Sequence, residues 1–183
     1  MFDYEQPLRS GGKLEAGLRT DILYLDNSFY AETFDDESGR YLADESLNNN
    51  FLFNQNVFAG YGTYSKEWGK YGLKLGLRAE QTFRTGELQG ADPISRNYLW
   101  FFPTIHNSYQ LSDYTQFMVS YSRRINRPRS WRLNPFTNFN NPLSLRRGNP
   151  NLLPEDIHSF ELGVLQYIGD LTINGTLFYR RTN

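Results

Sequence analysis

Arginine is concentrated in one stretch of this chain. Residues 114–154 hold seven arginines and neither a lysine nor an acid. The planar guanidinium presents a rigid fork of donors that matches carboxylates and phosphates, so this stretch predicts a site for an anionic ligand. Nearby aromatic side chains at 131, 136 and 139 offer stacking faces for a sugar or an aromatic chelate. The candidate ligand-binding residues are Arg123, Arg124, Arg127, Trp131, Arg132, Arg146 and Arg147.

A second interpretation gives these arginines no ligand. Charged runs usually lie in solvent or pair with a partner, so the arginines would line a wet wall or neutralise acids from other segments. Five of the chain's 8 prolines lie between Pro128 and Pro154, where they stiffen a long connection. The sequence leaves both interpretations open.

Other chemistry is sparse. Cysteine is absent, which excludes disulfides, thiolate metal sites and cysteine nucleophiles. His106 and His158 lack zinc spacing, and no P-loop, dinucleotide or nucleophile motif occurs. The acidic segment Glu32–Glu45 predicts a solvated loop, since its carboxylates lack the spacing of a calcium-binding EF-hand. We expect no enzyme activity, no cofactor and no metal, and a sequence pI near 6.1 argues against a nucleic-acid partner.

The elements that position these residues show the period-two alternation of β-strands. In Tyr71–Phe83, leucines at 73, 75 and 77 alternate with Lys74, Gly76 and Arg78. Charges opposite leucines fit a lipid-facing wall backed by a wet lumen. The predicted lumen-facing residues are Lys74, Arg78 and Glu80, joined by Gln116, Ser120, Ser122 and Glu161. The predicted lipid-facing residues are Leu73, Leu75, Leu77, Phe117, Val119, Phe160, Leu162 and Ile173.

Seven such strands are predicted, and the connections between them alternate long and short. The strands are Gly12–Tyr30, Asn50–Tyr64, Tyr71–Phe83, Tyr98–Tyr109, Tyr114–Arg124, His158–Tyr167 and Leu171–Arg180. The long connections are Ala31–Asn49, Thr85–Arg96 and Asn126–Pro154, and the short ones are Ser65–Lys70, Gln110–Asp113 and Ile168–Asp170. Outer-membrane barrels have this rhythm, because their periplasmic turns are short and their extracellular loops long. The prediction is an all-β chain, an antiparallel up-and-down meander that forms part of a transmembrane β-barrel.

Two segments resemble a known family. The first segment is Tyr121-Ser122-Arg123-Arg124-Ile125-Asn126-Arg127-Pro128. The second is Arg146-Arg147-Gly148-Asn149-Pro150-Asn151-Leu152-Leu153-Pro154-Glu155. Together they resemble the barrel region of TonB-dependent outer-membrane receptors, most closely the Bacteroidetes outer membrane β-barrel protein group. The resemblance extends over nearly the whole chain, in the family's order.

The resemblance implies ligand uptake through a barrel of about 22 strands with a plug domain inside. Residues 1–183 would be a partial segment of that barrel, without plug or signal peptide, in the Gram-negative outer membrane. The implied partners are outer-membrane lipid, the rest of the barrel and its plug, TonB through the plug region, and a lipoprotein. The arginine-rich stretch itself, apart from the resemblance, could attract the phosphates of lipid A. The resemblance also implies that the long arginine-containing loop folds against the barrel mouth.

Two alternatives stay open. The chain could form a small stand-alone or self-associating barrel, which needs an even number of strands or a partner chain. Pairing between Met1–Arg9 and Leu171–Arg180, within one chain or between two, would support this alternative. The chain could also form a soluble β-sandwich that binds carbohydrate, because a sheet with one solvated face shows the same alternation.

Overall fold

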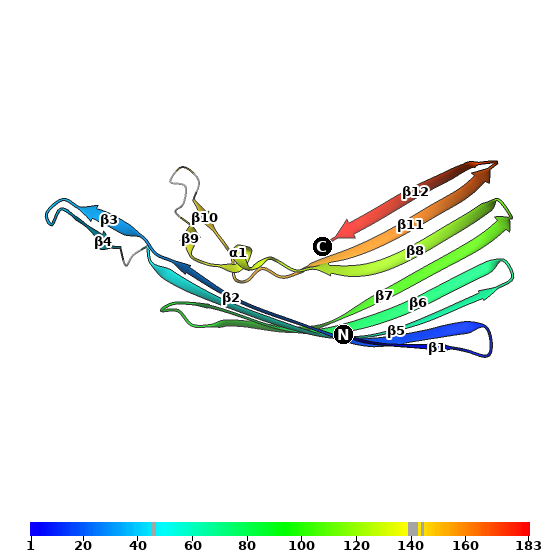
Figure 1. The fold of residues 1–183 in the computed structure, drawn as a ribbon, viewed down its shortest axis with the longest axis horizontal. Coiled ribbons are helices and arrows are strands. Elements are labelled where there is room, and N and C mark those ends of the chain that lie inside the picture. Colours follow the sequence, from blue (N-terminus) through cyan, green and yellow to red (C-terminus); the bar gives the residue numbers. More distant parts are fainter. Residues whose placement is uncertain (45–46, 139–142, 144) are drawn as a thin grey trace.

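The fold is a single curved sheet of long antiparallel strands. The computed structural model describes residues 1–44, 47–138, 143 and 145–183. The sheet strands are β1 (Phe2–Pro7), β2 (Gly12–Phe29), β5 (Asn49–Trp68), β6 (Tyr71–Leu88), β7 (Ile94–Ser112), β8 (Thr115–Asn126), β11 (Glu155–Ile168) and β12 (Leu171–Thr182). They lie in the order β1-β2-β5-β6-β7-β8-β11-β12, so each long strand pairs with the next long strand in the chain (Figure 1).

Tight turns join the strands in pairs at one end of the sheet. Figure 1 places the β1–β2, β5–β6, β7–β8 and β11–β12 turns together at that end. Gly69 and Gly169 both have φ of 58°, a left-handed conformation that glycine adopts without steric cost. The predicted antiparallel meander is confirmed. The strand number is corrected from seven to eight, because Phe2–Pro7 forms a full strand beside β2.

The connections at the opposite end are less uniform than predicted. β6 extends to Leu88 and β7 begins at Ile94. The predicted long connection Thr85–Arg96 is therefore a short one that covers only residues 89–93. The other two are long. One contains the hairpin of β3 (Glu32–Asp35) and β4 (Arg40–Ala43), and the other contains α1 (Ser130–Leu133), β9 (Thr137–Asn138) and β10 (Arg146–Arg147).

The acidic segment is therefore a hairpin rather than an irregular loop. Its turn is closed by a hydrogen bond of 2.8 Å from the Gly39 amide to the Asp35 carbonyl. The Asp35 carboxylate accepts hydrogen bonds from the side chain and the backbone of Ser38, which hold its pKa below the usual value. Glu45, at the end of the segment, lies outside the described residues.

The register separates two faces of the sheet. Leu75 lies opposite Tyr64 on β5 and Ile105 on β7, and Val119 lies opposite Leu162. All eight predicted lipid-facing residues share this face, and Leu77 keeps 52% of its surface exposed. An apolar face with no protein against it is the pattern of a barrel wall in lipid.

The longest strands exceed what a bilayer requires. β5 has 20 residues and β6 has 18, whereas a tilted membrane strand needs about 9–11. Past Ala79 the outer face of β6 becomes mostly polar, with Gln81, Thr85 and Glu87. The half of these strands far from the tight turns therefore extends beyond the apolar band.

The only core cluster among the described residues lies in that extension. Phe51 and Phe53 on β5 pack with Leu133 of α1, and each is 2% exposed. Leu25 and Leu88 pack against them. The β8–β11 connection thus lies against the sheet. That it folds against the mouth of a closed barrel stays a prediction.

The sheet is open. Among the described residues β1 pairs with β2 alone and β12 with β11 alone, so this chain does not close on itself as a small barrel. The long strands also form one layer, whereas a β-sandwich needs two sheets packed face to face. No helix in the described part of the chain is both long and apolar enough to span a membrane.

Candidate ligand-binding site

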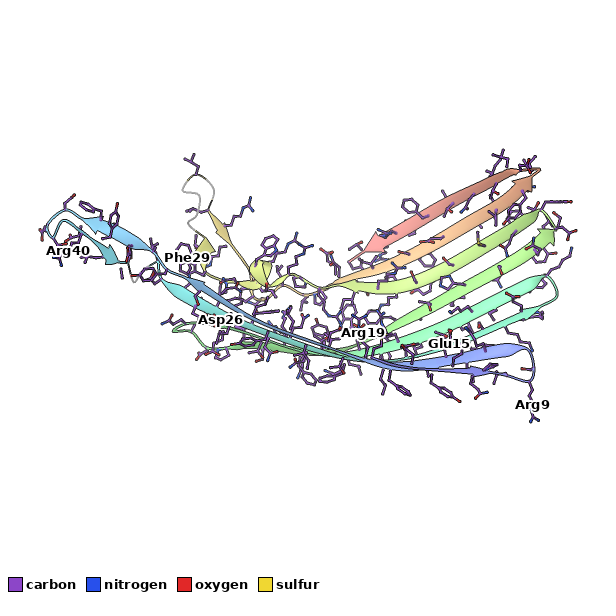
Figure 2. The ribbon with its side chains drawn as sticks, viewed as in Figure 1. Arg9, Glu15, Arg19, Asp26, Phe29 and Arg40 are labelled. Carbon is purple, nitrogen blue, oxygen red and sulfur yellow. The ribbon has the colours of Figure 1, made fainter. Side chains whose placement is uncertain are left out.

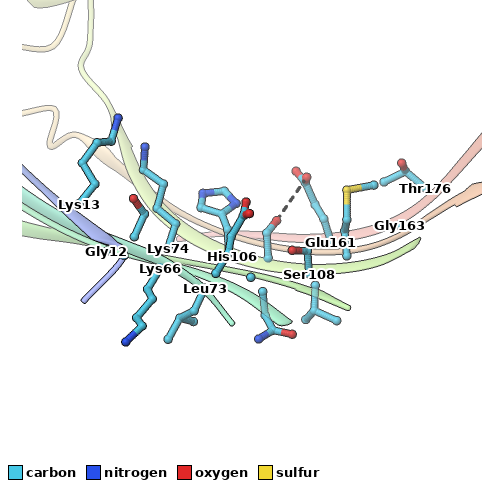
Figure 3. A pocket seen from close by; sticks show the side chains of 18 residues that line it. Gly12, Lys13, Lys66, Leu73, Lys74, His106, Ser108, Glu161, Gly163 and Thr176 are labelled. Carbon is cyan, nitrogen blue, oxygen red and sulfur yellow. Dashed lines mark hydrogen bonds between the residues drawn. The ribbon is translucent and has the colours of Figure 1, made fainter. Parts of the chain in front are cut away.

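Polar side chains gather on the concave face of the sheet. Lys74 lies opposite Ser65 on β5 and His106 on β7, and Ser120 lies opposite His106 and Glu161. Figure 3 shows Lys13, Lys74, His106 and Glu161 on one side of the ribbon, with Leu73 on the other. These polar residues line a hollow of about 580 Å³ that extends from β2 to β12 near the tight turns.

Ion pairs organise this face from end to end. The Glu15 carboxylate lies 2.7 Å from the Lys13 ammonium and 3.2 Å from that of Lys74. Further along β6, Arg78 pairs with Glu80 at 3.0 Å, and the Arg78 guanidinium lies 5.0 Å from the ring centroid of Phe102. Lys74, Arg78 and Glu80 thus share the concave face. That this face lines the lumen of a closed barrel stays a prediction.

Two of the seven candidate residues are already paired. Arg123 makes a two-pronged ion pair with Asp156 through contacts of 2.9 and 2.8 Å, and its guanidinium lies 5.1 Å from the ring centroid of Trp100. Arg127 pairs with the buried Glu80 on β6 and donates to the Thr82 hydroxyl at 3.1 Å. Arg127 therefore ties the start of the β8–β11 loop to the wall.

The other candidates are exposed and have no acid within ion-pair distance among the described residues. Trp131, Arg132, Arg146 and Arg147 line one hollow of about 460 Å³ together with Phe136 and Leu152. The Arg132 guanidinium lies 5.2 Å from the ring centroid of Trp131. Three cations and an aromatic face in one hollow can bind a planar anion by hydrogen bonding and stacking.

A neighbouring hollow shares Trp131, Arg132 and Leu152 with this one. It measures about 330 Å³ and is lined by Arg127, Arg129, Trp131, Arg132 and Glu155, among others. Arg123 and Arg124 line neither hollow. The structure thus gathers four of the seven candidates at one site, and Phe139 lies outside the described residues.

Sequence reasoning missed a second group of cations on the concave face. Arg84 on β6 lies directly opposite Arg96 on β7, and Thr82 lies opposite Tyr98. The signal was present, because the alternation through Arg78 and Glu80 continues to Thr82 and Arg84. This signal was overlooked because the predicted strand Tyr71–Phe83 ends one residue before Arg84.

The meander, the apolar outer face and the polar concave face define a segment of an outer-membrane β-barrel wall. The chain belongs to the outer membrane protein β-barrel family, whose model matches residues 1–183. Its location is the Gram-negative outer membrane. This agrees with the family resemblance seen in the sequence.

Solved structures share the fold. The copper transporter OprC matches with a TM-score of 0.65 at 13% identity, over 94% of this chain and 27% of that one. The ferric yersiniabactin uptake receptor FyuA from Yersinia pestis matches with a TM-score of 0.60 at 14% identity, over 94% of this chain and 26% of that one. This chain therefore spans about a quarter of each. A search of curated protein sequences gave no significant match.

Proposed function

We propose that residues 1–183 form part of the barrel wall of a TonB-dependent receptor that binds an anionic ligand and takes it up across the outer membrane. One observation carries the proposal: Trp131, Arg132, Arg146 and Arg147 line one hollow in a loop that is packed onto the concave face. The loop holds cations that have no acid partner among the described residues, beside the path that a solute would follow into a barrel. The two structural neighbours, a copper transporter and a ferric yersiniabactin uptake receptor, support the same activity.

The partners follow from that activity. Outer-membrane lipid contacts the leucine face, and further strands continue the sheet from β1 and β12. A plug domain fills the lumen and connects to TonB, which supplies the energy for uptake. A lipoprotein is a further partner of the receptor. The wall contributes binding and passage, and no enzymatic step is assigned to it.

Ligand binding tests this proposal with the protein purified from outer membranes in detergent. The probes are ferric and cupric citrate, because they combine carboxylates with ferric iron and copper, the metals of the two structural neighbours. We expect the triple variant Arg132→Gln, Arg146→Gln, Arg147→Gln to bind the preferred probe at least tenfold more weakly. Arg40→Gln in the β3–β4 hairpin is the matched control, and it should bind like the wild type.

Uptake by cells is the second arm of the test. Accumulation of the bound probe should stop when a protonophore removes the proton-motive force, because TonB-dependent uptake is energised. Equal binding by the wild type and the triple variant would contradict the assignment of the hollow. Uptake that persists with the protonophore would contradict the energised mechanism.

A further inference from the structure

Two arginines face each other on the concave wall without an acid between them. Arg84 on β6 and Arg96 on β7 are direct cross-strand partners. Like charges at such positions repel, and a sheet normally avoids the arrangement. No ion pair formed by the described residues involves either arginine.

Arg84 is also buried. Its side chain and backbone together are 4% exposed, because the β8–β11 loop covers it. Nη2 of Arg84 donates to the Leu152 carbonyl at 3.1 Å, whereas Nη1 has no acceptor among the described residues. A buried guanidinium with an unmatched donor is costly unless an anion completes it.

Two more buried polar atoms without partners belong to the same neighbourhood. The Tyr98 hydroxyl and Nε of Arg127 both lack an acceptor among the described residues. Tyr98 lies opposite Thr82, and Arg127 donates to that same threonine at 3.1 Å. Thr82 is two residues from Arg84 on the same face, so the register brings all three unmatched groups to one patch of wall.

Glu80, which lies on the same face of β6 as Arg84, is already engaged. The Glu80 side chain is buried, and its two carboxylate oxygens form ion pairs with Arg78 and Arg127 respectively. It therefore neutralises charge at one end of the patch and leaves Arg84 and Arg96 uncompensated at the other.

From this geometry we infer a second anion-binding site on the wall, formed by Arg84, Arg96 and Tyr98 beneath the Asn151–Leu152 segment. Its ligand is a small oxyanion, a carboxylate or phosphate group, that accepts from Arg84 Nη1 and the Tyr98 hydroxyl while Arg96 adds charge. None of these three residues lines the hollow around Trp131, although Leu152 borders both. The site does not depend on TonB-driven uptake.

Access comes from the side of Arg96. Its side chain is exposed and one of its nitrogens donates to the Asn151 side chain at 2.7 Å. An anion reaching Arg96 from solvent would meet the covered Arg84 next, because the two lie side by side in the register.

Isothermal titration of the detergent-purified protein with inorganic phosphate and with citrate tests the inference. Wild-type protein should bind at least one of them. The exposed substitution Arg96→Gln should weaken binding at least tenfold, and Tyr98→Phe, which removes only the hydroxyl, should weaken it severalfold. Arg40→Gln serves as the matched control, with unchanged binding expected.

The same titration separates this site from the loop hollow. The triple loop variant should retain binding of whichever of the two anions, phosphate or citrate, the wild type binds, even if it loses the metal citrates. The heat-dependent shift in gel migration that marks a folded barrel must persist in every variant. Failure of the wild type to bind either anion, or equal binding by Arg96→Gln, would overturn the inference, and a carboxylate from elsewhere in the barrel would then be the partner of Arg84.

Discussion

Adjacent residues of one strand lie on opposite faces of the sheet, one apolar and one polar. Leu75 lies on the apolar outer face beside Tyr64 and Ile105, whereas Lys74 lies on the concave face near Glu15. This contrast is the feature of the wall most accessible to mutation, because the two residues share the same backbone context.

Leu75→Arg should destabilise membrane assembly by about 2–4 kcal/mol, the cost of a basic residue on the lipid face near the bilayer midplane. Lys74→Gln should change assembly far less, because its side chain keeps a polar surrounding. A urea titration of folding into lipid bilayers, compared with the wild type, measures both changes. Equal tolerance at the two positions would show that the face assignment is wrong.

At the scale of elements, the β8–β11 connection is fixed to the wall by apolar contacts and a few polar ones. The ring centroid of Phe136 in the loop lies 6.3 Å from that of Phe29 on β2. Leu133 enters the cluster with Phe51 and Phe53, and Arg84, Arg96 and Arg127 hold the loop by hydrogen bonds and an ion pair. The exposed arginines of the loop depend on these anchors for their placement.

Leu133→Ala should loosen the loop, because truncating a buried leucine costs about 2–5 kcal/mol. Arg146 and Arg147 are trypsin sites held in the short β9–β10 ladder, so a loosened loop should be cut there many times faster. The rate of cleavage, followed by mass spectrometry, measures the effect. Leu145→Ala in the same loop is the control, since Leu145 is 56% exposed, and a matching rate in the two variants would show that Leu133 is not an anchor.

At the scale of the whole molecule, the two ends of the sheet differ in kind. Figure 2 places Arg9 at the end with the tight turns and Arg40 far away at the tip of the hairpin. In outer-membrane barrels the short turns are periplasmic and the long connections extracellular. The extensions of β2, β5, β6 and β7 would then rise from the cell surface.

Cysteine labelling of intact cells tests this orientation in a chain that has no native cysteine. Arg40→Cys should react with a membrane-impermeant maleimide on whole cells. Asp170→Cys, in the β11–β12 turn, should react only after the outer membrane is permeabilised. The reverse pattern would place the arginine loop in the periplasm and remove it as a site for external ligands.

The sequence by itself determined the fold class and the facing of most strands. Alternation is local, and in the apolar band it contrasts leucine with lysine or arginine, so Leu73–Glu80 could be assigned directly. The contrast fades where the outer face leaves the lipid, because water accepts Thr85 and Glu87 as readily as the polar concave face accepts Arg84. That is why β6 and β7 were predicted too short and their connection too long.

Only the tertiary structure decided which cations are paired and which are not. The ion pair between Arg127 and Glu80 joins segments far apart in the chain. Arg84 and Arg96 are placed side by side by the pairing of two neighbouring strands. Such contacts depend on register and on the path of a long loop, neither of which is set by local spacing. The arginine-rich stretch indicated an anion site, but the fold divided its members between anchors and free cations and revealed a second cluster that composition does not show.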